Sequence, residues 1–90
     1  MMKDSMKGKG PNLDFMRVRW WDAADLGKAW VDREEIEAFA NEPVEVISYG
    51  YLVTQNKAYV VLAADYVCSD GGYSRVTKIP RPWVRKMEKL

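Results

Sequence analysis

Apolar and polar residues alternate along the first patterned stretch of the chain, residues 14–20, and this period of two predicts a β-strand. Successive side chains of a strand lie on opposite faces, so one face is expected to join the core while the other faces outward. The expected core face carries Met16, Val18 and Trp20, and the opposite face carries Arg17, Arg19 and Trp21.

Residues 32–41 form the one segment with a clear helical pattern. Asp32 followed three residues later by Glu35 is a capping-box sequence, in which side chains bond the first free backbone N–H groups of a helix. Pro43 prevents the helix from continuing. One helical face carries the apolar residues Ile36, Phe39 and Ala40.

Three further strands follow the helix, because β-branched and aromatic residues dominate each of three segments separated by polar turns, the second of which contains two glycines. Gly50 lies inside the first of them and indicates a bulge or a sharp bend. The strands are expected at residues 44–54, 58–67 and 73–79, with turns at 55–57 and 69–72.

The sequence Pro80-Arg81-Pro82 ends the fourth strand, because neither proline can donate a backbone hydrogen bond. Two structures fit residues 83–90: a short fifth strand after a single helical turn, or a C-terminal helix. The helix is suggested by Val84, Met87 and Leu90, which recur every three residues. We favour the strand.

These elements predict a mainly β (α+β) fold, a small five-stranded barrel of the SH3/Sm-like type. One helix lies between strands 1 and 2 and is expected to cover an open end of the barrel. Closing short, bent strands into a barrel removes exposed sheet edges. The alternative is an open four-stranded sheet with helices on one face. We expect residues 1–12 to be a flexible tail and residues 13–90 to be a single domain.

The composition argues against most enzyme classes. The chain has no histidine and a single cysteine, Cys68, so it lacks the commonest general base and the usual zinc ligands. Capping and turn formation account for Asp32 and Asp70. We therefore expect no catalysis, no metal and no cofactor. No apolar run approaches the roughly 20 residues of a membrane helix, which predicts a soluble, cytoplasmic protein without a membrane partner.

Charge is divided along the chain although the formal net charge is only +1. Residues 22–45 contain eight acidic and two basic residues, whereas residues 75–90 contain six basic residues and one acid, Glu88. The acidic middle and the basic end can attract each other within one molecule, join two copies, or leave the basic end free for an anion. Simple solvated surface charge is the plain alternative. We expect a homo-oligomer, because a small core often needs that support.

Four tryptophans and five tyrosines are many for 90 residues. We expect Trp20, Trp30 and Phe39 in the core. Exposed aromatic rings beside arginine and lysine can stack on bases and hold phosphate, or anchor a protein interface. A structural role for the aromatics, and basic edges that prevent aggregation, are the alternatives. The candidate ligand-binding residues are Arg17, Arg19, Trp21, Tyr49, Tyr51, Tyr73, Arg75, Lys78, Arg81 and Trp83.

Three short motifs resemble a set of small, uncharacterised proteins encoded by bacteriophages. They are the W-x-D-A motif at Trp20-Trp21-Asp22-Ala23, the S-x-G-x-L-V motif at residues 48–53, and the I-P motif at Ile79-Pro80. The resemblance covers residues 17–90 and implies a phage accessory protein that acts on a host system.

Two functions follow as hypotheses. In the first, a non-catalytic counter-defence protein sequesters a small anionic ligand, such as a signalling nucleotide, in the host cytoplasm. In the second, the protein binds and inhibits, or adapts, a host or phage protein. Nucleic-acid binding is compatible with the same residue types but is not favoured.

Overall fold

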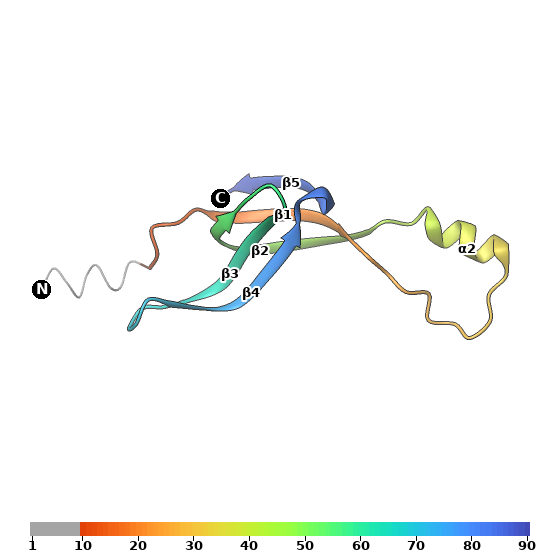
Figure 1. Ribbon diagram of the computed structural model, residues 1–90. Helices are drawn as coiled ribbons and strands as arrows, with labels where there is room; N and C mark the ends of the chain where they lie inside the picture. Colours follow the sequence, from red (N-terminus) through yellow and green to blue (C-terminus); the bar gives the residue numbers. More distant parts are fainter. Residues whose placement is uncertain (1–9) are drawn as a thin grey trace, which may run out of the picture.

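The computed structural model describes residues 10–90, which form one curved antiparallel sheet and one short helix set apart from it (Figure 1). The strand order in the sheet is β4-β3-β2-β1-β5. In chain order the elements are β1 (Phe15–Asp22), α2 (Arg33–Ala40), β2 (Val44–Gln55), β3 (Tyr59–Val67), β4 (Gly72–Pro80), the single 3₁₀ turn η1 (Arg81–Trp83) and β5 (Val84–Lys89).

The expectation of a mainly β fold with five antiparallel strands and one helix is confirmed. The C-terminal segment is a strand rather than a helix, and it pairs with β1, with Val18 opposite Met87. The alternative with four strands is wrong for the same reason. Of the expected flexible tail, residues 1–9 lie outside the described part of the chain.

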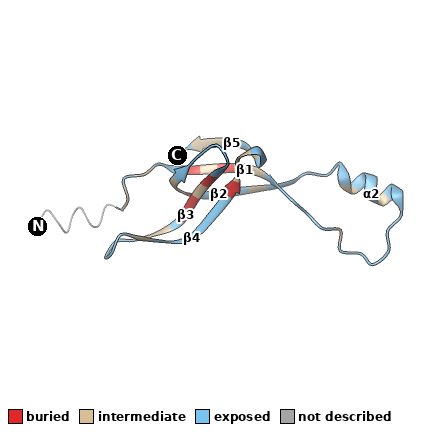
Figure 2. Cartoon of the chain, in the orientation of Figure 1, coloured by how far each residue is buried: buried red, intermediate tan, exposed pale blue. Residues whose placement is uncertain are grey.

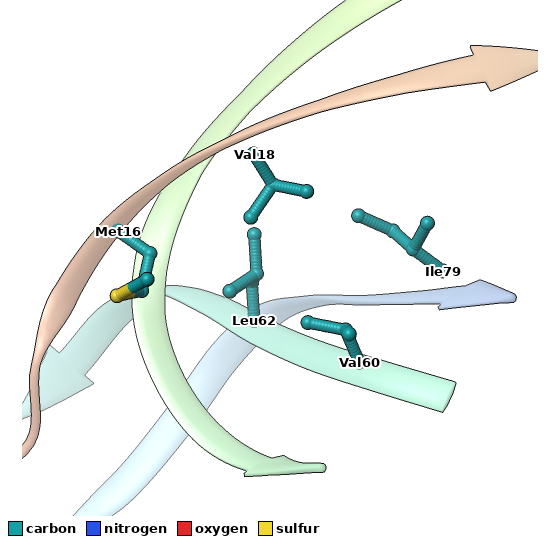
Figure 3. Packing of buried hydrophobic residues seen from close by; sticks show 5 residues of the cluster. All are labelled: Met16, Val18, Val60, Leu62 and Ile79. Carbon is teal, nitrogen blue, oxygen red and sulfur yellow. The ribbon is translucent and has the colours of Figure 1, made fainter. Parts of the chain in front are cut away.

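The core lies where the sheet bends over itself. Val18 of β1 and Ile79 of β4 belong to the same buried cluster, although β2 and β3 separate their strands in the sheet. Such contact requires the sheet to curve, so that its concave face encloses apolar side chains. Figure 3 shows the side chains of Val18, Val60, Leu62 and Ile79 converging, with Met16, the fifth member of the cluster, to one side of them.

Gly50 is required by the close approach of β2 to β3. A Cβ atom at this position would lie 2.8 Å from the backbone oxygen of Ala63, a distance at which the backbone would have to shift. The irregularity predicted here lies slightly further along β2, where the pairing register with β3 shifts between Leu52 and Thr54. Gly50 therefore permits close packing, and the bulge follows it.

In both hairpin turns a side-chain oxygen accepts hydrogen bonds from backbone N–H groups. The Asn56 Oδ1 atom accepts from the backbone N–H groups of Ala58 and Tyr59, each at 2.8 Å. In the second turn, Gly71 has a φ of 77°, which glycine adopts at little cost, and Asp70 Oδ1 accepts from the Gly72 N–H at 2.8 Å.

We call residues 22–45 the arm and the rest of the described chain the body. The arm includes α2, which begins where the sequence predicts: Asp32 Oδ1 accepts from the Glu35 N–H at 2.8 Å. The helix projects away from the sheet and has no buried residue (Figures 1 and 2). The expectation that it covers an end of the sheet is wrong.

Two expected core residues lie in the arm. Trp30 is 91% exposed, and Phe39 is only half-buried, so the prediction that both join the core is wrong. Trp20 does pack against the buried cluster, as expected. The helical period shows which apolar side chains share a face, but it does not show which surface that face contacts.

Candidate ligand-binding site

A pocket of about 310 Å³ crosses three neighbouring strands of the body. This volume is at the lower end of the roughly 300–1,000 Å³ usual for ligand pockets. The lining comes in pairs from β2, β3 and β4: Ser48 and Tyr49, Leu62 and Ala64, and Arg75 and Thr77.

Strand geometry explains why these residues meet. Residues two apart on a strand lie on the same face, which brings Leu62 together with Ala64. Leu62 also pairs with Thr77 across the β3–β4 ladder. Leu62 is 2% exposed and belongs to the core cluster, so the pocket has a rigid apolar wall. Ser48 and Thr77 each carry a hydroxyl group, and the Ser48 hydroxyl accepts a hydrogen bond from Trp20 Nε1 at 3.0 Å.

Arg75 has an unusual backbone at this pocket. Its φ of 51° is the one positive value of a non-glycine residue among residues 10–90. Conformations of this kind cost on the order of 1 kcal/mol or more and are enriched at ligand sites. The residue with this backbone conformation is thus also one of the residues that line the pocket.

The Arg75 guanidinium makes a two-point contact with Asp65. Nε donates to one carboxylate oxygen at 2.7 Å and an Nη donates to the other at 2.9 Å, while the Ser74 hydroxyl donates to the same carboxylate at 3.0 Å. The hydrogen bond from Arg75, followed by that from Ser74, lowers the pKa of Asp65 below its ordinary value. Arginine has five N–H donors, so three remain for a ligand.

A second ion pair stands beside Tyr49. Arg17 lies opposite Tyr49 in the β1–β2 ladder, and its Nε donates to Glu88 at 2.8 Å. The hydrogen bond to Glu88, and after it one to Tyr49, raise the pKa of Arg17 above its ordinary value. Tyr49 is 51% exposed. Arg17 is its neighbour on β1 but is not among the residues that line the pocket.

The other predicted basic residues are held at separate places by different partners. In the sheet β2 and β3 lie between β1 and β4. The basic residues of β1 and β4 do not form the single cluster that the expected pairing of the last strand with the first suggested. Arg19 contacts Glu45 at 3.4 Å, Lys78 lies 4.5 Å from the centre of the Tyr59 ring, and Arg81 donates to the Asn56 backbone oxygen at 2.8 Å and to Gln55.

The remaining predicted aromatic residues also lie outside the pocket. Each contacts another ring or a cation, as expected for partly exposed aromatics on a sheet. Trp21 lies under Arg85 at 4.2 Å, Tyr51 meets Phe15 edge to face at 5.3 Å, Tyr73 is 5.4 Å from Tyr66, and Trp83 stacks on Trp20 at 6.3 Å.

The structure therefore brings together two of the ten predicted residues in the pocket, Tyr49 and Arg75, with Arg17 opposite Tyr49 on the neighbouring strand. Sequence reasoning missed Ser48 and Thr77, whose hydroxyls line the pocket, and the role of Asp65. The spacing of Arg75 and Thr77 was a usable signal, since residues two apart share a strand face. No pattern in the sequence gives their alignment with Ser48.

Comparison with known proteins gives no relative: no family model matches the chain, and neither a curated protein nor a solved structure matches it. Within residues 10–90, no group of three acidic or cysteine side chains is arranged to hold a metal ion. In the same part of the chain, no helix has the length and apolar character needed to cross a membrane.

Proposed function

We propose that the protein is a non-catalytic binding protein that sequesters a small anionic ligand, with a nucleotide as the class that fits best. The observation that carries this proposal is the pocket, in which an aromatic residue, Tyr49, and a strained arginine, Arg75, meet two hydroxyl groups on a rigid sheet. Stacking on the ring and charge-assisted bonds from the guanidinium suit a base and a phosphate.

The charges around the pocket limit the ligand. Asp65 neutralises Arg75, and Glu88 neutralises Arg17, so a single copy offers no large positive field. A ligand with one anionic group suits this balance better than one with several phosphates. The carboxylate of Asp65 also offers an acceptor to sugar hydroxyls near the arginine.

We also propose that the curved sheet belongs to the small SH3/Sm-like barrels. The strand order, the single 3₁₀ turn before β5, and the packing of Val18 against the same cluster as Ile79 support this. The short motifs of the chain support a phage-encoded accessory protein that acts in the host cytoplasm against a defence signal. A barrel of this size is filled by its own side chains, so a ligand binds on its surface pocket.

The test is calorimetric titration with AMP, GMP and inorganic phosphate at low salt. We expect a nucleotide to bind and Arg75→Ala to weaken binding at least about tenfold, the effect of a lost charged contact. Lys78→Ala is the matched control, because it removes one positive charge from the same strand outside the pocket. Equal losses in the two variants would show a non-specific charge effect and contradict the proposal.

Native mass spectrometry of the protein from phage-infected cells tests sequestration directly. We expect a retained mass of several hundred daltons in the wild type and none in Arg75→Ala. Absence of any retained mass, together with no binding of AMP, GMP or phosphate at millimolar concentration, would overturn the assignment.

The second candidate function is that of a protein-binding inhibitor or adaptor. It is favoured by two free sheet edges, since β4 and β5 each pair with only one neighbour, and such edges can accept a strand from a partner. A stoichiometric host or phage polypeptide that co-purifies without a small molecule would support it. Its binding should also persist as ionic strength rises, unlike capture of a phosphate.

A further inference from the structure

The arm and the body carry opposite charge. The arm has eight acidic and two basic residues, a formal charge of −6, whereas the body within residues 10–90 has nine basic and four acidic residues, a formal charge of +5. In Figure 1 the arm extends away from the sheet. Apart from the Arg19–Glu45 pair at 3.4 Å, where the arm joins the sheet, the two charges are held apart within one molecule, although their attraction favours contact.

The arm also exposes several apolar side chains to solvent. Trp30 is 91% exposed, Ile36 is 48% exposed and Val31 is 36% exposed. An isolated helix of eight residues is marginal in water, and the cap at Asp32 adds only on the order of 1 kcal/mol. Tryptophan is the residue most enriched among interface anchors. The helix is thus expected to gain stability by packing on another surface.

The surface that suits the arm is formed by η1 and β5 together with the end of β1. Residues 81–90 carry four basic residues and one acid. Two tryptophans lie there, Trp83 at 39% and Trp21 at 43% exposure, and β5 has one unpaired edge. Within this surface Arg85 lies over the Trp21 ring, and Lys86 is 3.6 Å from Glu88, yet the formal charge of residues 81–90 remains +3.

We propose that the arm of one copy docks on the η1–β5 surface of a second copy, with Trp30 and Ile36 against the tryptophans and the acidic residues against Arg85 and Lys86. Charge complementarity selects a second copy as the partner, because the same chain supplies both signs on separate regions. Charged groups around apolar anchors are the usual composition of such interfaces.

The first test is the mass of the purified protein by light scattering and sedimentation, without added ligand. We expect the wild type at micromolar concentration to have at least twice the 10.4 kDa mass of the chain. Trp30→Ser should raise the dissociation constant about tenfold or more, as for an interface anchor. Val76→Ser is the control: it removes a 56% exposed apolar side chain from β4, and we expect no change.

The second test is charge exchange. Glu34→Lys with Glu42→Lys should weaken self-association, as should Arg85→Glu with Lys86→Glu, and mixing the two double variants should restore a complex. A fold defect would not be restored by mixing, so this result separates docking from stability. Association should also weaken between about 0.1 and 1 M salt, over which the screening length falls from about 10 to 3 Å.

A wild-type protein that is monomeric at micromolar concentration would overturn the inference. So would an oligomer insensitive to Trp30→Ser and to the charge exchange, or a chain that is monomeric alone but binds a different polypeptide through the arm. The lining of the pocket is unchanged in every variant, so this inference and the proposed ligand binding can fail independently.

Discussion

The body and the arm use similar residues with different results. In the body, Val18, Val60 and Ile79 are fully buried, because strands on a bent sheet place their side chains against one another. In the arm, Ile36 and Trp30 remain exposed although their apolar surface is equally unfavourable in water. The body buries a cluster of apolar side chains within one chain, whereas no residue of α2 in the arm is buried.

This difference teaches that hydrophobic pattern and burial are separate properties. A strand in a sheet pairs with at least one neighbouring strand. Where the sheet bends, the apolar side chains on its concave face pack against those of other strands. The short α2 has one partly apolar face and no opposing layer in the same chain. The exposed apolar side chains of the arm are therefore where we expect contact with another molecule.

Removing a core side chain should give the largest effect. Ile79→Ala leaves a cavity in the buried cluster and should lower the free energy of unfolding by about 2–5 kcal/mol. Ile36→Ala, the same change in the arm, should alter it by less than about 0.5 kcal/mol at concentrations where the protein is monomeric. Thermal and urea unfolding followed by circular dichroism measure both. Equal effects would refute the contrast between the two regions.

A methyl group added at Gly50 should have the next largest effect. The new Cβ atom would meet the Ala63 backbone oxygen, and we expect Gly50→Ala to cost about 1–3 kcal/mol in urea unfolding. Gly27→Ala in the arm is the control, since its Cβ has no neighbour within 4 Å, and its effect should stay within about 0.5 kcal/mol. A stable Gly50→Ala would mean that β2 and β3 are less closely packed.

Loss of the helix cap should act on the arm alone. Asp32→Ala removes the acceptor for the Glu35 N–H and should cost α2 about 1 kcal/mol. Amide hydrogen exchange in the Trp30→Ser background, which isolates the arm from a partner, should accelerate at residues 34–38 and stay unchanged in β1–β5. Asp25→Ala is the matched acidic control. Faster exchange throughout the strands would show that arm and body unfold together.

Acidification should give the smallest effect, and it belongs to the body. Hydrogen bonds from Arg75 and from Arg17 lower the pKa of Asp65 and of Glu88 in the folded state. A lowered folded pKa stabilises the protein above the unfolded pKa, and this contribution is lost as pH falls below about 4. Both carboxylates are partly exposed, so solvent screens the gain.

Wild type and Glu88→Gln compared by thermal unfolding between about pH 3 and 6 give the measurement. The midpoint of the wild type should fall on acidification, and that of the variant should fall less. If the unfolding midpoint of Glu88→Gln changed with pH as much as that of the wild type, the Arg17–Glu88 pair would not contribute to the pH dependence.

Local signals predicted the elements well. The period of two in β1, the capping box at Asp32, and the prolines before η1 each act within a few neighbouring residues, so their outcome depends little on the rest of the chain. The pairing of β5 with β1 also followed from the expected strand topology. The exposure of Trp30 and Phe39 did not follow from the sequence, because burial of a side chain depends on which surface lies opposite it in the fold.

The candidate site was predictable only in part. The residue types of Tyr49 and Arg75 suggested ligand binding from their chemistry alone, because aromatic rings stack and arginine carries many donors. Eight other candidates had the same chemistry and lie elsewhere. Nothing in the chain order indicates that Ser48 on β2 faces a pocket shared with Thr77 on β4.

The sequence by itself indicated the first four strands and the helix, the cap of the helix, and the division of charge between residues 22–45 and the basic C-terminal end, but it left residues 83–90 open between a strand and a helix. The tertiary structure alone decided which residues share the pocket, that Asp65 and Glu88 neutralise Arg75 and Arg17, and that the arm leaves the sheet. The physical reason is range: capping and periodicity act between neighbours in the chain, whereas register, curvature and burial arise from pairing between residues far apart in it.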